Sequence, residues 1–140
     1  MKTRFSVAAL PGQKCGLYLH IPYCETKCGY CDFFSVALKH RDTLPLIERL
    51  ISELGSRLAD PHPTIRTIFC GGGTPTILPV DRLNLLLQSI TAAVSMSEVV
   101  EFTVEANPAT LDDEKVELLV AAGVAYPIKL VQRRGQVPLE

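Results

Sequence analysis

Apolar residues gather in three short runs that lie far apart along the chain. The runs cover residues 17–21, 65–70 and 99–104, and they are rich in Val, Ile, Leu, Phe and Tyr. Short apolar runs of this composition, bounded by polar residues, are typical of strands. The pattern therefore predicts three strands, each followed by a stretch long enough to hold a helix.

The stretches between and after these strands repeat apolar residues at helical spacing. Asp42 and Thr43 are candidate caps for the first helix, and Pro45 lies in its first turn. Pro79 and Asp81 open the second helix. The apolar faces are Leu44, Ile47, Leu50, Ile51, Leu54 and Leu58 in the first helix, then Leu83, Leu86, Leu87, Ile90 and Val94 in the second.

A third helix follows the last strand. Thr110, with Asp113 three residues later, resembles a capping box, and Gly123 is expected to end the helix. Val116, Leu119 and Val120 are predicted to form its apolar face.

The predicted element order is β-α-β-α-β-α, which favours an α/β fold of parallel strands with helices packed outside. Three such units cannot close an eight-unit barrel. The sequence therefore predicts an open sheet or part of an α/β barrel.

Length and composition exclude several classes of protein. The chain has 140 residues, which corresponds to one domain, and its net charge of −1 argues against a nucleic-acid binder. No apolar stretch approaches the roughly 20 residues that cross a bilayer, and the run at residues 7–10 is shorter than a signal peptide needs. We therefore expect a cytoplasmic protein, in which five cysteines indicate thiolate or metal chemistry rather than disulfides.

Three cysteines follow the first predicted strand directly. Cys24, Cys28 and Cys31 form a C-x3-C-x2-C triplet, and three soft thiolates this close together can hold one metal centre. A zinc site would need a fourth ligand such as His20, His40 or Cys70. An iron–sulfur cube held by three cysteines would leave one iron open to a small chelating ligand.

Two further candidate features lie at the ends of the next strands. Gly71, Gly72 and Gly73 follow the second strand, where residues without a Cβ permit close approach of a ligand or simply a tight turn. Glu105 closes the third strand and could accept hydrogen bonds from a bound ligand, or be solvated. Tyr18 on the first strand could contact a ligand or pack in the core.

The cysteine triplet, placed after the first strand of an α/β repeat, resembles that of the radical S-adenosylmethionine superfamily. The resemblance implies a [4Fe–4S] cluster on Cys24, Cys28 and Cys31, with the amino and carboxylate groups of S-adenosylmethionine on the fourth iron. It also implies a partial TIM-type (β/α)6 barrel. Residues 1–124 would form the first half of that barrel as three β/α units.

Residues 17–24, 69–76 and 103–108 are similar to a narrower group, the oxygen-independent coproporphyrinogen III oxidases and the HemW-type heme chaperones. The resemblance implies heme or porphyrin, an electron donor such as flavodoxin or ferredoxin, and a heme-acceptor protein as partners. By position, Tyr18, Gly72 and Glu105 match contacts to the cluster-bound cofactor, whereas Tyr30, Gly73 and Thr74 match contacts to a second cofactor molecule in the oxidase.

The chain departs from this group at two places. The oxidases carry a fourth cysteine two residues beyond the third, where this chain has Phe33, so the heme-chaperone branch is favoured. The oxidase activity and a zinc-stabilised module remain as alternatives. Residues 125–140 no longer resemble the group, and we expect a divergent tail left by truncation. Cys15 and Cys70 match no motif, and we expect both to be small buried apolar residues.

Overall fold

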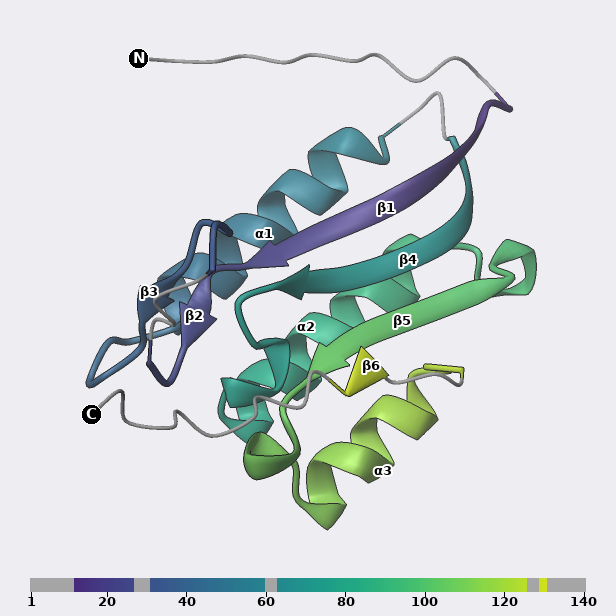
Figure 1. Ribbon diagram of the computed structural model, residues 1–140. Helices are drawn as coiled ribbons and strands as arrows, with labels where there is room; N and C mark the ends of the chain where they lie inside the picture. Colours follow the sequence, from purple (N-terminus) through teal and green to yellow (C-terminus); the bar gives the residue numbers. More distant parts are fainter. Residues whose placement is uncertain (1–11, 27–30, 60–62, 126–128, 131–140) are drawn as a thin grey trace, which may run out of the picture.

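A sheet of four parallel strands organises the molecule (Figure 1). This computed structural model describes residues 12–26, 31–59, 63–125 and 129–130. The sheet has the order β1-β4-β5-β6, and a separate pair of short parallel strands, β2 and β3, follows β1. The strands are β1 (Lys14–Ile21), β2 (Tyr23–Cys24), β3 (Val36–Ala37), β4 (Thr64–Gly72), β5 (Glu101–Ala106) and β6 (Lys129–Leu130). The predicted α/β class with parallel strands is confirmed.

Three helices connect the strands of the sheet, as expected. They are α1 (Leu44–Arg57), α2 (Val80–Ala93) and α3 (Asp113–Ala121), and α2 packs between α1 and α3. Three short 3-10 turns accompany them: η1 (Pro75–Ile77), η2 (Met96–Glu98) and η3 (Pro108–Thr110). Because η1 and η3 follow β4 and β5 directly, they shape the loops at the carboxyl edge of the sheet.

The core lies between the helices and one face of the sheet. Alternate residues of each strand point into it, and the apolar stripe of each helix covers them. The predicted face of α2 is buried in full. The strand residues of the core are Leu19, Ile21, Ile65, Ile68, Cys70, Phe102 and Val104.

The other face of the sheet carries a different set of side chains. The register pairs Tyr18 with Phe69, and Phe69 with Thr103. Since side chains two residues apart share a face, His20 and Glu105 lie on this same face, away from the core. The sheet therefore separates an apolar packing face from a face that carries aromatic, imidazole and carboxylate groups.

The caps of the first and third helices are built from nearby side chains and a glycine. Asp42 Oδ1 accepts from the N–H of Leu44 at 2.9 Å, so the predicted cap acts from the position before Thr43. At the end of α3, Gly123 has φ +82°, and the Val124 N–H donates to the Leu119 carbonyl at 3.0 Å. This is the left-handed cap that was expected of a glycine here.

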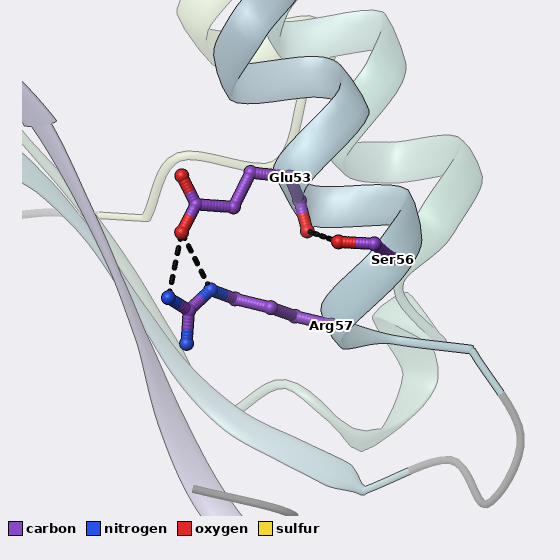
Figure 2. Close-up of polar contacts among 3 residues, drawn as sticks. All are labelled: Glu53, Ser56 and Arg57. Atoms are coloured by element: carbon purple, nitrogen blue, oxygen red, sulfur yellow. Dashed lines mark hydrogen bonds and ion pairs between the residues drawn. The ribbon is translucent and has the colours of Figure 1, made fainter. Parts of the chain in front are cut away.

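The last turn of α1 carries an exposed ion pair (Figure 2). Arg57 Nε donates to Glu53 Oε1 at 2.7 Å, and the hydroxyl of Ser56 donates to the Glu53 carbonyl at 3.0 Å. Exposed pairs of this i,i+4 type contribute only about 0.3–0.5 kcal/mol. The end of α1 is therefore held mainly by its buried residues, such as Leu54 and Leu58.

The third helix corrects two expectations. Its cap is Asp112, whose Oδ1 accepts from the Lys115 N–H at 2.8 Å, and not a Thr110–Asp113 capping box, because Thr110 belongs to η3. Val120 is 66% exposed while Leu119 is fully buried. A helix of nine residues packs through a narrow stripe, so Val120, at 100° from Leu119, faces outward, whereas Leu118 on the other side still packs against the core.

Two further boundaries bear on the predictions. The third strand begins at Glu101, two residues later than predicted, and Val100 before it is exposed. The short strand β6 pairs with β5 and lies beyond residue 124, so the predicted division into residues 1–124 and 125–140 stays a prediction. Within the described residues no helix has the length and apolar character needed to cross a membrane.

Candidate functional site

Three segments meet at the carboxyl edge of the sheet: the chain after β1, the glycine turn at the end of β4, and the end of β5. The Gly73 N–H donates to the Ile21 carbonyl at 2.8 Å, and the Thr74 N–H donates to the Tyr23 carbonyl at 2.7 Å. The Gly72 N–H donates to Glu105 Oε2 at 3.1 Å. These three bonds join the glycine turn to both neighbouring segments.

Two of the three predicted cysteine ligands are described. Cys24 lies on β2 and is buried, and its Sγ is 4.0 Å from the hydroxyl oxygen of Thr74, which donates to it. Cys31 is partly buried, whereas Cys28 and Tyr30 lie outside the described residues. Among the residues that are described, no three metal-binding side chains gather. The structure therefore brings Cys24 next to the glycine turn and leaves the geometry of the whole triplet untested.

The glycine turn needs glycine for a steric reason. Gly72 has φ +109°, a backbone conformation that L side chains rarely adopt, and a Cβ there would overlap the ring of His20. A Cβ on Gly71 would lie 2.8 Å from Glu105 Oε2. The turn can therefore pass this close to the Glu105 carboxylate and the His20 ring only because it has no side chains.

Glu105 is the carboxylate at the centre of this edge. It is partly buried at the end of β5 and accepts the Gly72 N–H through one oxygen. A half-buried carboxylate with one neutral donor keeps lone pairs for a cationic ligand group. The predicted pair Gly72 and Glu105 is thus brought together.

Tyr18 and His20 form a hydrogen-bonded chain on the same face of the sheet. His20 Nε2 lies 2.9 Å from the Phe34 carbonyl, which can only accept, so Nε2 carries the proton. His20 Nδ1 is then the acceptor for the Tyr18 hydroxyl at 2.9 Å. This chain ties the segment that follows Cys31 to strand β1.

The Tyr18 ring stacks on Phe69, with ring centroids 5.9 Å apart. Burial, the nearby Glu105 carboxylate and Cys70 together raise the pKa of Tyr18 above its ordinary value. Tyr18 therefore stays a neutral hydroxyl near Glu105.

Cys70 and Cys15 lie on the core side of the sheet. Cys70 is 2% exposed, and burial raises the pKa of its thiol to about 12. Cys15 is partly buried and packs against the core. Cys70 thus behaves as a small apolar residue of the core, as expected.

Three residues at this edge were not singled out from the sequence. The hydroxyl of Ser35 is buried, at 4% exposure of the residue, and has no hydrogen-bond partner among the described residues. Thr76 and Lys115 are also buried and polar. A lysine inside the apolar stripe of a helix is a visible signal, but its partners are main-chain carbonyls, which a sequence does not show.

Comparison with known proteins assigns the chain to a family. The model of the radical SAM superfamily matches residues 18–130. The chain belongs to the radical SAM superfamily. The match begins within β1 and includes the cysteine segment, the glycine turn and Glu105, which meet at the carboxyl edge.

Curated relatives of similar sequence carry one name. The chain is 40% identical over 107 residues to the "Heme chaperone HemW" of Lactococcus lactis, which is 76% of this chain and 27% of that protein. It is 39% identical over 109 residues to the HemW of Bacillus subtilis and 38% identical over 113 residues to that of Escherichia coli. These matches cover 76% and 77% of this chain, and 29% of each relative. The chain thus spans less than a third of the length of these relatives.

A solved structure shares the fold. Coproporphyrinogen III oxidase (HemN) from Escherichia coli, described as a radical SAM enzyme, superimposes with a TM-score of 0.69. The superposition covers 82% of this chain and 27% of that chain, at 20% sequence identity. The likeness extends the parallel β/α arrangement to a known radical SAM protein, and at this identity it concerns the fold.

Proposed function

We propose that Cys24, Cys28 and Cys31 hold a [4Fe–4S] cluster, and that Tyr18, Gly72 and Glu105 bind S-adenosylmethionine beside it. The contact between the Gly72 N–H and Glu105 Oε2, at 3.1 Å, carries this proposal, because it places a carboxylate and an open main-chain turn on the edge where Cys24 lies. Three thiolates suit an iron–sulfur cluster with one open iron. The residues present therefore fit both groups.

Each residue has a defined role in this proposal. The Glu105 carboxylate accepts from the ammonium of the cofactor, and the carbonyls of the glycine turn approach it without steric hindrance. The Tyr18 hydroxyl, held by His20, fixes the ring that borders the site. The cluster and S-adenosylmethionine, when bound, supply one-electron radical chemistry, and the chain supplies binding and orientation.

Contacts of Tyr30, Gly73 and Thr74 with a second cofactor molecule stay a prediction. The N–H groups of Gly73 and Thr74 are both bonded to carbonyls of the segment before Cys24. We propose that Gly73 and Thr74 hold the glycine turn against the cysteine segment. A second cofactor would have to use other atoms of these residues.

We propose further that the protein acts as a heme chaperone that binds heme and passes it to an acceptor protein. The support is the 38–40% identity to proteins named HemW and the presence of Phe33 where the oxidases carry a fourth cysteine. Phe33 is exposed and has no metal-binding atom. The donor that reduces the cluster is proposed to be flavodoxin or ferredoxin, in a cytoplasmic setting.

Anaerobic reconstitution tests the cofactor proposal. We expect the dithionite-reduced protein to give a [4Fe–4S] EPR signal that shifts when S-adenosylmethionine is added. Cys24→Ser should lose most of the cluster, whereas Cys70→Ser, a matched change at a core cysteine, should keep it. A colourless protein that binds one zinc ion would overturn the proposal and favour the structural zinc module.

Heme transfer is tested separately on the reconstituted protein. We expect a heme-dependent absorbance band and passage of heme to an apoprotein, with no decarboxylation of coproporphyrinogen III. Decarboxylation without stable heme binding would contradict the chaperone proposal and support the oxidase alternative.

A further inference from the structure

We propose that Lys115 is a positioning residue that holds the glycine turn and Glu105 in the arrangement that binds S-adenosylmethionine. This inference rests on the proposed function of that edge. Lys115 lies on α3 and touches neither Glu105 nor the glycine turn in any contact that the structure records among the described residues. It acts on them through the loops that follow β4 and β5.

Lys115 joins these two loops through its ammonium group. Its Nζ donates to the Thr76 carbonyl at 2.9 Å and to the Thr110 carbonyl at 3.0 Å. Thr76 belongs to η1 after β4, and Thr110 belongs to η3 after β5. In Figure 1, α3 lies below β5 and follows the loop at the end of this strand.

The hydroxyl groups of Thr76 and Thr110 also link the loop after β4 to the loop after β5. Thr110 Oγ1 donates its single hydrogen to the Asn107 carbonyl at 2.8 Å. It must therefore accept from Thr76 Oγ1, which lies 2.6 Å away and in turn accepts from the Asn107 N–H at 3.3 Å. Every hydroxyl hydrogen in this ring is used, so the two loops have one defined relative position.

The charge of Lys115 indicates that the residue does more than fill space in the core. The residue is 9% exposed, and among the described residues the hydrogen-bond partners of its Nζ are neutral carbonyls, with no carboxylate in an ion pair with it. Burying an ammonium without a counter-charge costs free energy, and an apolar side chain would fill the space without that cost. Its charge-assisted bonds thus serve to fix two carbonyls from separate loops.

Those loops begin at the proposed cofactor residues. Thr76 lies four residues after Gly72, and Asn107 lies two residues after Glu105. The Gly72–Glu105 bond links the ends of β4 and β5. The Lys115 bonds link the two loops that follow these strands. Loss of the Lys115 bonds should therefore let the turn and the carboxylate move apart before any cofactor binds.

The variant Lys115→Met tests this, because Met is an unbranched side chain only one atom shorter than Lys and has no N–H donors. We expect the iron content to stay at the wild-type level and the affinity for S-adenosylmethionine, from the EPR titration, to fall about tenfold or more, as loss of charged hydrogen bonds implies. Glu117→Met places the same new side chain on an exposed position of α3 and should leave the affinity unchanged. Thr110→Val, a smaller change, should give a weaker effect in the same direction.

A double-mutant cycle separates positioning from general stability. If Lys115 acts by placing Glu105, the effects of Lys115→Met and Glu105→Gln on affinity should not add, because Glu105→Gln already removes the charge that Lys115 places. Effects that add in full would overturn the inference. So would wild-type affinity in a folded Lys115→Met protein.

Amide hydrogen exchange in the cofactor-free protein gives a readout that needs no cofactor. We expect faster exchange in residues 71–76 and 105–110 of Lys115→Met, and no change there in Glu117→Met. Unchanged exchange in both segments would overturn the inference. A wild-type protein that holds a cluster but shows no response to S-adenosylmethionine would instead refute the proposed function, and the exchange result would still decide the role of Lys115.

Discussion

Glu105 and Gly72 form the residue pair on which the proposed cofactor site depends. Glu105→Gln keeps the shape of the side chain and an oxygen for the Gly72 N–H, but it removes the charge that attracts an ammonium. We expect the affinity for S-adenosylmethionine to fall by about 10- to 100-fold, the range of one charged hydrogen bond, with the cluster intact. An EPR titration of the reduced protein measures this.

The matched control is Glu101→Gln on the same strand. Glu101 is exposed and accepts from the Thr103 hydroxyl at 2.9 Å, at the opposite end of β5. This variant should bind the cofactor as the wild type does. Equal losses in both variants would show that the effect comes from strand β5 as a whole rather than from the Glu105 carboxylate.

The thiol of Cys70 gives a prediction about pH. Its pKa is raised by burial to about 12 in the folded protein, against an ordinary value of 9.0. Between these two values the unfolded chain releases this proton and the folded protein keeps it, so the free energy of unfolding should fall as pH rises. For this one group the slope reaches at most about 1.4 kcal/mol per pH unit.

Urea unfolding of wild type and Cys70→Ala between pH 8 and about 10.5 isolates the effect. The variant is less stable at pH 8 because it loses a buried sulfur, but its stability should fall less steeply with pH. Identical slopes would mean that Cys70 ionises in the folded protein as readily as in the unfolded chain.

Residue types at strand ends made much of the site predictable. Glu105 and the three glycines follow apolar runs directly, and the carboxyl ends of parallel strands share one edge, so their meeting could be expected. Lys115 could not be found this way. Its partners are the carbonyls of Thr76 and Thr110. Because every residue has a main-chain carbonyl, the sequence does not show which of them a lysine contacts.

At the scale of elements, helical periodicity predicted the buried residues correctly in a helix that is covered on several sides. It predicted them poorly in a helix that is covered along a narrow stripe. All five apolar positions predicted for α2 are buried, because α2 packs between two other helices and against the sheet. In α3, Leu119 is buried but Val116 and Val120 are exposed. The spacing of Val residues along a helix is the same whether or not a neighbouring element covers them. Which of them are buried is therefore decided by tertiary packing.

Two glycines, one inside a helix and one just beyond a helix, should respond in opposite ways to the same substitution. Gly55 lies inside α1, and a Cβ there would meet nothing within 4 Å. Gly55→Ala should therefore stabilise the protein by about 0.5–1 kcal/mol through helix propensity. Gly123 caps α3 with φ +82°, so Gly123→Ala should destabilise it by about 1 kcal/mol or more.

Chemical denaturation of the two variants beside the wild type measures both effects. The pair serves as its own control, because the added methyl group is the same. Stabilisation by both substitutions would mean that α3 ends without the left-handed residue at position 123.

At the scale of the whole molecule, the two faces of one sheet have separate tasks. The core face holds the helices through residues such as Ile68 and Phe102, and the opposite face carries Tyr18, His20 and Glu105. The alternation that divides them is visible in the sequence. The short strands β2 and β3 were not predicted, because two-residue strands leave no periodic signal.

Strand β4 should be the most stable part of this arrangement. It pairs with β1 along eight residues and with β5 on its other side, and Ile68 in its centre is buried. Helix α3 contacts α2 and leaves two valines exposed. Native-state hydrogen exchange should therefore show β4 amides opening only by global unfolding, and α3 amides opening at lower free energy.

The variant Ile68→Val distinguishes these two kinds of opening. It should lower the global stability by about 0.5–1.5 kcal/mol and the protection of β4 amides by the same amount. Amides of α3 should not change, because a state in which only α3 has opened still keeps the Ile68 contacts. Equal losses of protection in β4 and α3 would show that the helix and the sheet unfold as one unit. In that case α3, which carries Lys115, would not open separately from the sheet.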